Sequence, residues 1–367
     1  MEQFEFSVPM PFLKEEIDQL VEINKKIQKS QITNLYFNLP TTCPMATAFE
    51  QNRNFATQTP DFEYWKYLMA YSVEKGFDFI YLINSPRRLD IERPEFLKEL
   101  DKLHKLLEEL QKIGVNKLRV SNPKLLTYLS QHYNKFILYA STSFEYKTIK
   151  EYQNFMALHP TVKQIVPSHD LNKNFRLLEN LRKSFPDIGI EMLVNEGCLG
   201  GCPHRLEHSR EIRLVPFCSA NGDFTLSNKY CISSCRNLSK RNDILYMCKS
   251  NYINPWEIEE YAKIGINNFK LVGREQHHDA EINHIKRYET YLLGVDDVAN
   301  IADVPYKELL YRFGDISLKL TVKEIKDLLP QISYFKEKGH LCASDCDITC
   351  HYCDTCAEKI TQLNFGE

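Results

Sequence analysis

The feature that most constrains the fold is a repeated alternation of short apolar runs with longer amphipathic segments. The short runs are rich in Ile, Val, Leu, Phe and Tyr, which is typical of buried parallel strands. The longer segments carry apolar residues at three- and four-residue spacing, as at Leu100, Leu103, Leu107 and Leu110, which predicts helices with one apolar face. The predicted strands are Ile32–Asn38, Phe77–Asn84, Lys117–Ser121, Lys135–Thr142, Lys163–Pro167, Gly189–Val194 and Asn268–Val272. The predicted helices are Lys14–Lys29, Asp61–Lys75, Pro94–Ile113, Pro123–Tyr133, Phe144–Leu158, Asn172–Ser184 and Pro255–Ile264.

This order of elements predicts an α/β fold, and we favour a (β/α) TIM-like barrel over a large open parallel sheet. In such a barrel the active site lies at the carboxyl ends of the strands. Several predicted strand ends are polar, although Ser, Asn and Asp are also ordinary helix-cap residues. These ends include Asn84-Ser85-Pro86, Ser121-Asn122-Pro123, Ser168-His169-Asp170, Asn195-Glu196-Gly197 and Gly273-Arg274-Glu275.

The alternation stops near Val295. We therefore predict a barrel domain over residues 1–295 and a small helical, cysteine-rich appendage over residues 296–367. Within the appendage, Tyr306–Phe313 is predicted to be helical. Thr321 and Glu324 form a capping-box pattern for a second helix that begins at Val322 and ends near Pro330.

Charge and hydropathy narrow the class of protein. The chain has 46 basic and 49 acidic residues mixed along its length, so no like-charge block predicts nucleic-acid binding. The first residues, 1–11, do not combine a basic segment with an apolar run, and no stretch reaches the length of about 18 apolar residues that a membrane span needs. We expect a cytoplasmic protein without a membrane partner.

In that compartment twelve cysteines indicate metal or redox chemistry rather than disulfides. Cys43 stands alone. The other eleven form two blocks, one of six within 51 residues and one of five within 15. The first block is Cys198, Cys202, Cys218, Cys231, Cys235 and Cys248, and the second is Cys342, Cys346, Cys350, Cys353 and Cys356.

The first block follows the predicted strand Gly189–Val194 and is therefore expected at the barrel mouth. Gly197, Gly200 and Gly201 give the backbone freedom to wrap a cofactor and to direct amide N–H groups at its sulfurs. A [4Fe–4S] cluster needs four ligands, and zinc in a four-cysteine site is the alternative metal. His204 and His208 are alternative ligands or substrate-orienting groups. The preferred thiolate set is Cys198 and Cys202, one or both of Cys231 and Cys235, and Cys248.

The second block contains the spacing Cys346-x3-Cys350-x2-Cys353, which is also the radical SAM motif. In radical SAM enzymes this motif follows the first barrel strand, whereas here 14 residues follow Cys353. Cys342 and Cys356 also offer a fourth thiolate that would close the open iron position. We therefore predict an auxiliary or electron-relay cluster, so the chain would hold one [4Fe–4S] cluster or two.

A helix–strand segment completes the motifs. The run from Pro255 to Arg274 reads as a helix, a glycine at its end, and a strand that closes on Lys270-Leu271-Val272-Gly273-Arg274. Lys270 and Arg274 are four residues apart at a strand end, where both are predicted to point into the mouth and bind a carboxylate or phosphate. An ordinary surface cation at a strand end is the alternative reading.

This run resembles the helix–strand segment of the peptidase U32 family, whose members end this strand in a Lys-Ile-Glu-Gly-Arg-like sequence. The segments Leu118–Pro123 and Ile165–Ser168 and the cysteines after Val194 agree with it. The resemblance implies a (β/α) barrel that holds a [4Fe–4S] cluster on four cysteines. It also implies an activity closer to oxygen-independent hydroxylation than to proteolysis, because several members resemble hydroxylases that act on tRNA or a quinone precursor, some with prephenate as oxygen donor.

Three functions stay open at this point. The first is a redox enzyme in which Lys270, Arg274 and His204 bind an anionic donor or substrate. The second is a peptidase, although the sequence holds neither a His-Glu-x-x-His stretch nor a Gly-x-Ser-x-Gly elbow. The third is a non-catalytic subunit that relays electrons to a partner. The substrate is a peptide, a tRNA or a small anionic molecule.

Overall fold

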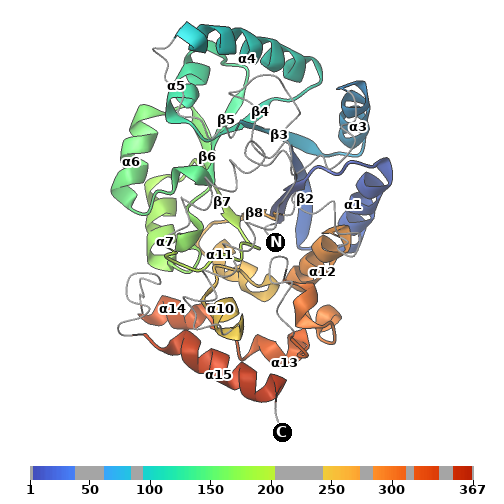
Figure 1. The fold of residues 1–367 in the computed structure, drawn as a ribbon, viewed down its shortest axis with the longest axis vertical. Coiled ribbons are helices and arrows are strands. Elements are labelled where there is room, and N and C mark those ends of the chain that lie inside the picture. The colour runs from blue at the N-terminus through green and yellow to red at the C-terminus, as the bar shows by residue number, and fades with distance from the viewer. Residues whose placement is uncertain are drawn as a thin grey trace, which may run out of the picture.

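Eight parallel strands close into a barrel in sequential order, as Figure 1 shows. This closed sheet confirms the predicted TIM-like barrel. The computed structural model describes residues 3–37, 62–83, 94–202, 243–272, 284–310, 318–338 and 350–365. The strands are β1 (Phe4–Pro9), β2 (Ser30–Phe37), β3 (Asp78–Ile83), β4 (Lys117–Val120), β5 (Ile137–Ala140), β6 (Val162–Ile165), β7 (Gly189–Leu193) and β8 (Asn268–Lys270).

Helices surround the barrel and continue beyond it toward the C-terminus (Figure 1). Those that follow β1 to β7 in the described residues are α1 (Lys14–Lys26), α3 (Phe62–Glu74), α4 (Pro94–Lys112), α5 (Pro123–His132), α6 (Ile149–Leu158), α7 (Phe175–Ser184) and α10 (Asp243–Lys249). The remaining ones are α11 (Ile258–Ala262), α12 (His284–Asp296), α13 (Val322–Lys326), α14 (Ile332–Lys338) and α15 (Tyr352–Asn364). No helix in the described part of the chain is long and apolar enough to cross a membrane.

Strand β1 was not among the predicted strands, and it is the one that closes the barrel. Phe6 pairs with Ile32 of β2 on one side and with Phe269 of β8 on the other. The sequence of β1 alternates, because Phe4, Phe6 and Val8 enter the outer core while Ser7 bonds to Glu191 across the interior. An alternating pattern is weaker than the continuous apolar run that marks a strand buried on both faces.

Two predicted helices begin later than expected because a side chain caps the backbone first. Thr148 Oγ1 accepts a hydrogen bond from Glu151 N, and the Glu151 carboxylate accepts one from Thr148 N at 2.8 Å, so α6 begins at Ile149 rather than Phe144. A separate 3-10 turn covers Thr142–Phe144. In the same way Asn174 Oδ1 accepts from Leu177 N, so α7 begins at Phe175 rather than Asn172.

The two helices predicted in the appendage differ from those observed, and α14 and α15 were not predicted. The segment predicted as Tyr306–Phe313 forms a 3-10 turn over Tyr306–Glu308, and its last residues lie outside those described. The capping box of Thr321 and Glu324 is present, but α13 ends at Lys326, before Pro330. The boundary near Val295 falls at the end of α12 and stays a prediction.

The core has two parts. The larger part fills the space between the outer faces of the strands and the helices, and it continues into the appendage through Cys353, Ala357 and Ile360. The smaller part lies inside the barrel, where Tyr36, Ile80 and Leu82 pack together with Tyr139 against them. The interior is therefore only partly apolar, which leaves room for the charged side chains described below.

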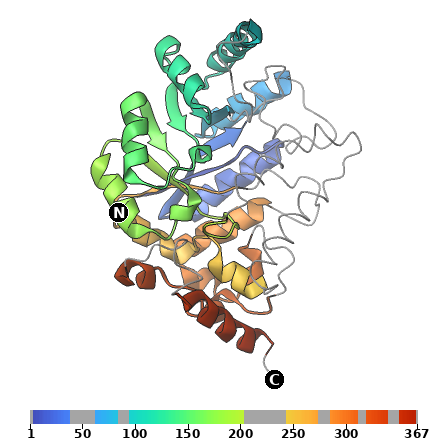
Figure 2. The ribbon, with the colours of Figure 1, turned by 60° about the vertical axis from the view of Figure 1, so that its left-hand side comes forward.

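The C-terminal helices lie on one side of the barrel, next to α7 and α10, in both Figure 1 and Figure 2. Close packing at the start of the C-terminal region requires a glycine. A Cβ atom on Gly294 of α12 would lie 2.5 Å from Ile301 Cδ1 and 3.0 Å from Pro255 Cβ. Gly294 thus allows α12 to approach the 3-10 turn Pro255–Glu257 closely.

Candidate functional site

The structure describes nine of the predicted site residues. It places them in three neighbouring regions: the barrel interior, the mouth, and the contact between α10 and α15. The described residues are Gly197, Cys198, Gly201, Cys202, Cys248, Lys270, Cys350, Cys353 and Cys356, whereas His204, Arg274, Cys231, Cys235, Cys342 and Cys346 lie outside the described residues.

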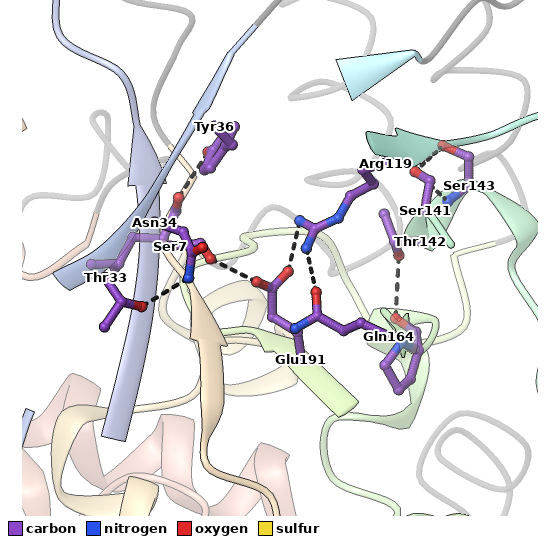
Figure 3. Close-up of polar contacts among 12 residues, drawn as sticks. Ser7, Thr33, Asn34, Tyr36, Arg119, Ser141, Thr142, Ser143, Gln164 and Glu191 are labelled. Atoms are coloured by element: carbon purple, nitrogen blue, oxygen red, sulfur yellow. Dashed lines mark hydrogen bonds and ion pairs between the residues drawn. The ribbon is translucent and has the colours of Figure 1, made fainter. Parts of the chain in front are cut away.

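The barrel interior contains a buried ion pair between two strands that are not neighbours. Arg119 Nη1 of β4 lies 2.7 Å from Glu191 Oε2 of β7, a contact with ion-pair rather than hydrogen-bond geometry. Arg119 Nη2 donates to Gln164 Oε1 at 2.7 Å, and Ser7 Oγ donates to Glu191 Oε1 at 2.8 Å. Figure 3 shows the guanidinium directed at both partners. The four side chains link β1, β4, β6 and β7 across the barrel.

Lys270 of β8 also lies in this interior, and its predicted role in anion binding stays a prediction. Its Nζ atom lies 4.0 Å from the centroid of the Tyr36 ring, and the Tyr36 hydroxyl donates to Leu271 O at 2.8 Å. Lys270 is two residues beyond Asn268, which is the register partner of Glu191, so the ammonium lies nearer the carboxyl ends of the strands than the ion pair does. Burial raises the pKa of the nearby Tyr139 to about 12.

At the mouth, the segments after β6 and β7 bring three potential ligand side chains together. Ligand atoms of His169, Glu196 and Cys198 all lie within 4.8 Å of one another. His169 and Glu196 are buried, and Cys198 is half-buried. Imidazole, carboxylate and thiolate are the protein ligands that zinc and iron use. A thiol near an imidazole is also the pairing that a cysteine nucleophile needs.

Asp170 holds the cysteine loop against the next segment of the mouth. Its Oδ1 atom accepts from Gly201 N at 2.9 Å and from Asn251 Nδ2 at 3.4 Å, while Lys147 Nζ contacts Oδ2 at 2.5 Å. Gly201 has φ of +68°, in the left-handed region that favours glycine. The backbone freedom predicted for Gly201 is therefore used to turn the chain immediately before Cys202.

Two buried asparagines fix the strand ends beneath this loop. Asn172 Nδ2 donates to Leu193 O at 2.8 Å and to Asn251 O at 2.7 Å. Asn195 exchanges two hydrogen bonds with the backbone of Val272, at 2.8 Å and 2.7 Å. Because each of these groups is buried and satisfied, the described part of the mouth is preorganised.

The cysteine loop is bonded to the segment that follows α10. Asn251 N donates to Cys198 O at 3.0 Å, Gly200 N donates to Lys249 O at 3.2 Å, and Leu199 forms a bridge with Ser250. Cys248 precedes this bridge by two residues. Cys248 is therefore adjacent along the chain to a segment of the mouth, but it contacts the second cysteine block instead.

Cys248 lies at the contact with the second cysteine block. Cys353 Sγ of α15 donates to Cys248 O at 3.5 Å, and both residues are buried, as is Cys356. Burial raises the pKa of the Cys248 thiol well above its ordinary value, and the charges of Cys353 and Cys356 raise it further. Cys350 Sγ lies 3.9 Å from the Tyr334 hydroxyl. The structure therefore places Cys248, which we grouped with Cys198, beside the block from Cys350 to Cys356.

Four residues of the interior and mouth were not among the predicted site residues. Arg119 and Glu191 each lie between two apolar residues in their strands, KLRV and GIEML, and that contrast was visible in the sequence. His169 and Glu196 were visible as polar strand ends. That these two side chains lie close together could not be predicted, because it depends on how β6 and β7 are placed around the barrel.

No family model matches the chain. A curated relative, "Uncharacterized protease MJ1657" of Methanocaldococcus jannaschii, is 22% identical over 358 residues, which cover 95% of each chain. Similar solved structures include the U32 peptidase Mk0906, with 13% identity, a TM-score of 0.45, and coverage of 74% of this chain and 93% of that one. The N-acetylneuraminate lyase from Fusobacterium nucleatum has 9% identity and a TM-score of 0.39, with 99% of each chain covered. The chain is thus similar over nearly its whole length to a protein that is named as a protease.

Proposed function

We propose that this chain is an iron–sulfur enzyme that carries out an oxygen-independent hydroxylation, or a related redox modification, at the barrel mouth. The observation that carries the proposal is the position of Cys198, whose thiol lies within 4.8 Å of ligand atoms of the buried His169 and Glu196. This group lies at the carboxyl ends of β6 and β7, which is where barrel enzymes hold their reacting groups.

Two thiols in the described part of the mouth support an iron–sulfur cluster as the cofactor. Cys198 and Cys202 lie on one loop, both half-buried, with the left-handed Gly201 between them. These two thiols would hold the cluster, and Cys231 and Cys235 are the predicted residues that would complete the set. When bound, the cluster supplies one-electron transfer at a potential that hydrogen bonds and solvent exposure tune. Zinc is the alternative metal for the same thiolates.

Lys270 would bind the anionic part of a donor or substrate. Its ammonium lies inside the barrel against the Tyr36 ring, so an anion that entered from the mouth would meet a cation in surroundings of low dielectric. Arg274 and His204 are the predicted partners of Lys270 in this role. The ion pair of Arg119 and Glu191 lies deeper in the barrel and holds its strands in position. Because its two charges cancel, it presents no net charge to the ligand.

Hydrolysis of a peptide is the second candidate. It is favoured by the same geometry, because Cys198, His169 and Glu196 could act as nucleophile, base and orienting group. The name of the curated relative agrees with this reading.

Reduction of the anaerobically purified chain with dithionite, followed by electron paramagnetic resonance, tests the first proposal against the second. We expect a reducible cluster signal that Cys198→Ala and Cys202→Ala remove or alter. Casein hydrolysis that persists after iron removal, and that requires both Cys198 and His169, would establish the hydrolase instead. Ala70→Ser changes a residue of α3 that touches none of these residues. It is the control for loss of the signal during purification rather than through the substitution.

A further inference from the structure

The tail and the barrel meet at cysteines that are far apart in the sequence. The Cys353 thiol contacts the carbonyl of Cys248 across a separation of 105 residues. The two helices that carry them, α10 and α15, pack directly against each other in Figure 1. Cys248, Cys353 and Cys356 are all buried, and Cys350, two residues before the start of α15, is half-buried.

We propose that Cys248, Cys350, Cys353 and Cys356 bind a thiolate-ligated metal centre of their own, which fastens the C-terminal tail to the barrel. This centre is distinct from the group at Cys198 and does not depend on the reaction proposed for the mouth. Its ligands come from two segments, so it exists only when α15 is docked on α10. Four thiolates suit an iron–sulfur cluster better than zinc here. Among the described residues, the group of three ligand side chains whose atoms lie within 4.8 Å of one another is the one at Cys198, and the ligands of a single zinc ion approach more closely than that.

The local geometry of α15 supports this ligand set. The helix begins at Tyr352, so Cys350 precedes it and Cys353 and Cys356 lie in its first two turns. Residues three apart on a helix lie on the same face, so the Cys353 and Cys356 side chains extend from one side of α15. The N-terminus of a helix carries unsatisfied N–H groups and a partial positive charge, both of which favour thiolates.

A buried cation lies next to the same contact. Lys173 Nζ donates to Cys248 O at 3.3 Å and to Ser250 O at 2.8 Å, and the Lys173 side chain is buried. Four thiolates around a divalent ion carry an excess negative charge, and an ammonium at this distance from the Cys248 backbone offsets part of it. A fixed cation is not needed if the cysteines serve only as small apolar side chains.

Packing is the competing explanation, because unligated cysteine is among the most buried residue types. The two explanations predict different effects when single cysteines are removed. In a packed contact, each cysteine contributes independently according to its burial, and the half-buried Cys350 contributes little. In a metal centre, removal of any one thiolate disrupts the same group.

Metal analysis of four variants of the full chain, purified without oxygen, tests the proposal. Cys248→Ala, Cys350→Ala and Cys353→Ala should each lower the iron and sulfide content, or the zinc content, by the same amount. The matched control Cys198→Ala should retain that complement. The element that is lost identifies the centre, since acid-labile sulfide accompanies iron in a cluster and is absent from a zinc site. Unchanged metal content in Cys248→Ala, or a loss in Cys353→Ala alone, would overturn the shared site.

A second measurement does not require the variants to fold. Amide hydrogen exchange of the wild-type chain, before and after treatment with a chelator, reports on the docking of α15. We expect exchange in α15 to accelerate at least tenfold after metal removal, while α5 on the far side of the barrel is unaffected. Equal exchange of α15 with and without metal would contradict the fastening role. Because Cys198→Ala leaves this centre in place, failure of the mouth proposal and failure of this one give different results.

Discussion

The guanidinium of Arg119 and the carboxylate of Glu191 form an ion pair at 2.7 Å inside the barrel, where each side chain is 1% exposed. The pair joins β4 to β7, and its outer hydrogen bonds extend to Gln164 and Ser7. Taking two charges out of water is costly, and attraction between them offsets that cost only while both partners are present. The interior is therefore sensitive to the loss of either one.

Arg119→Met should destabilise the fold by about 3–5 kcal/mol, because it leaves the Glu191 charge buried without its partner. Urea unfolding at neutral pH measures the change. Lys25→Met is the control, since Lys25 pairs with Glu22 at 2.7 Å on the surface, with both side chains at least 60% exposed. Equal effects of the two substitutions would show that the interior pair is solvated rather than buried.

Lys270→Met should weaken the binding of a small dicarboxylate such as prephenate by about tenfold or more, because one charge-assisted contact is removed. Lys117→Met is the matched control, because Lys117 enters the same barrel from the opposite end and pairs with Asp78 at 2.5 Å. Titration calorimetry compares the two variants with the wild type. Equal weakening in both would place the anion elsewhere.

Glu257→Gln should flatten the dependence of stability on pH between about 5 and 8. Burial raises the pKa of Glu257 to about 7 from an ordinary value of 4.5, although hydrogen bonds from Asn254 oppose the shift. The folded chain therefore binds a proton more tightly than the unfolded chain. The stability that Glu257 contributes is complete below about pH 4.5 and is lost as the pH rises through about 7, with a slope of up to about 1.4 kcal/mol per pH unit.

The measurement is the free energy of unfolding at several pH values. Glutamine keeps an oxygen that can accept from Asn254 N, so the hydrogen bond is retained while the titration is removed. Glu324→Gln is the control, because the Glu324 carboxylate lies in an exposed capping box and its pKa is lowered. A slope in Glu257→Gln as steep as in the wild type would assign the pH dependence to another group.

Gly294→Ala should destabilise the chain by about 1–3 kcal/mol, because the new methyl group overpacks a tight contact. The added Cβ would lie 2.5 Å from Ile301 Cδ1, which outweighs the gain of about 1 kcal/mol that alanine gives over glycine within a helix. Thermal unfolding measures the change. Ile301→Val removes that Cδ1 atom, so the double variant should recover part of the loss. A stabilised Gly294→Ala would show that α12 can shift without cost.

Much of the fold could be predicted from the sequence, because the outer faces of the strands and the apolar faces of the helices leave a periodic pattern. Seven strands were predicted in this way, whereas β1 was not, since Glu5 and Ser7 interrupt its apolar positions. The structure shows β1 paired with β2 and β8, and the apolar pattern of β1 alone does not predict this pairing.

The candidate site was less predictable, because its residues meet only in three dimensions. Motif spacing located Cys198, Cys202 and the tail block, but it grouped Cys248 with its neighbours in sequence. Cys248 packs instead against α15, across a contact that spacing along the chain cannot show. His169 and Glu196 were visible only as polar strand ends, and such ends are common wherever a helix is capped.

The central claim is that the mouth thiols hold an iron–sulfur cluster. The most direct test is iron and acid-labile sulfide analysis of the anaerobically purified full chain beside its Cys198→Ala variant. The account predicts a brown wild-type protein with about four or eight irons per chain, and a variant that has lost about four. A colourless, zinc-loaded wild type, or a Cys198→Ala variant with undiminished iron, would contradict it.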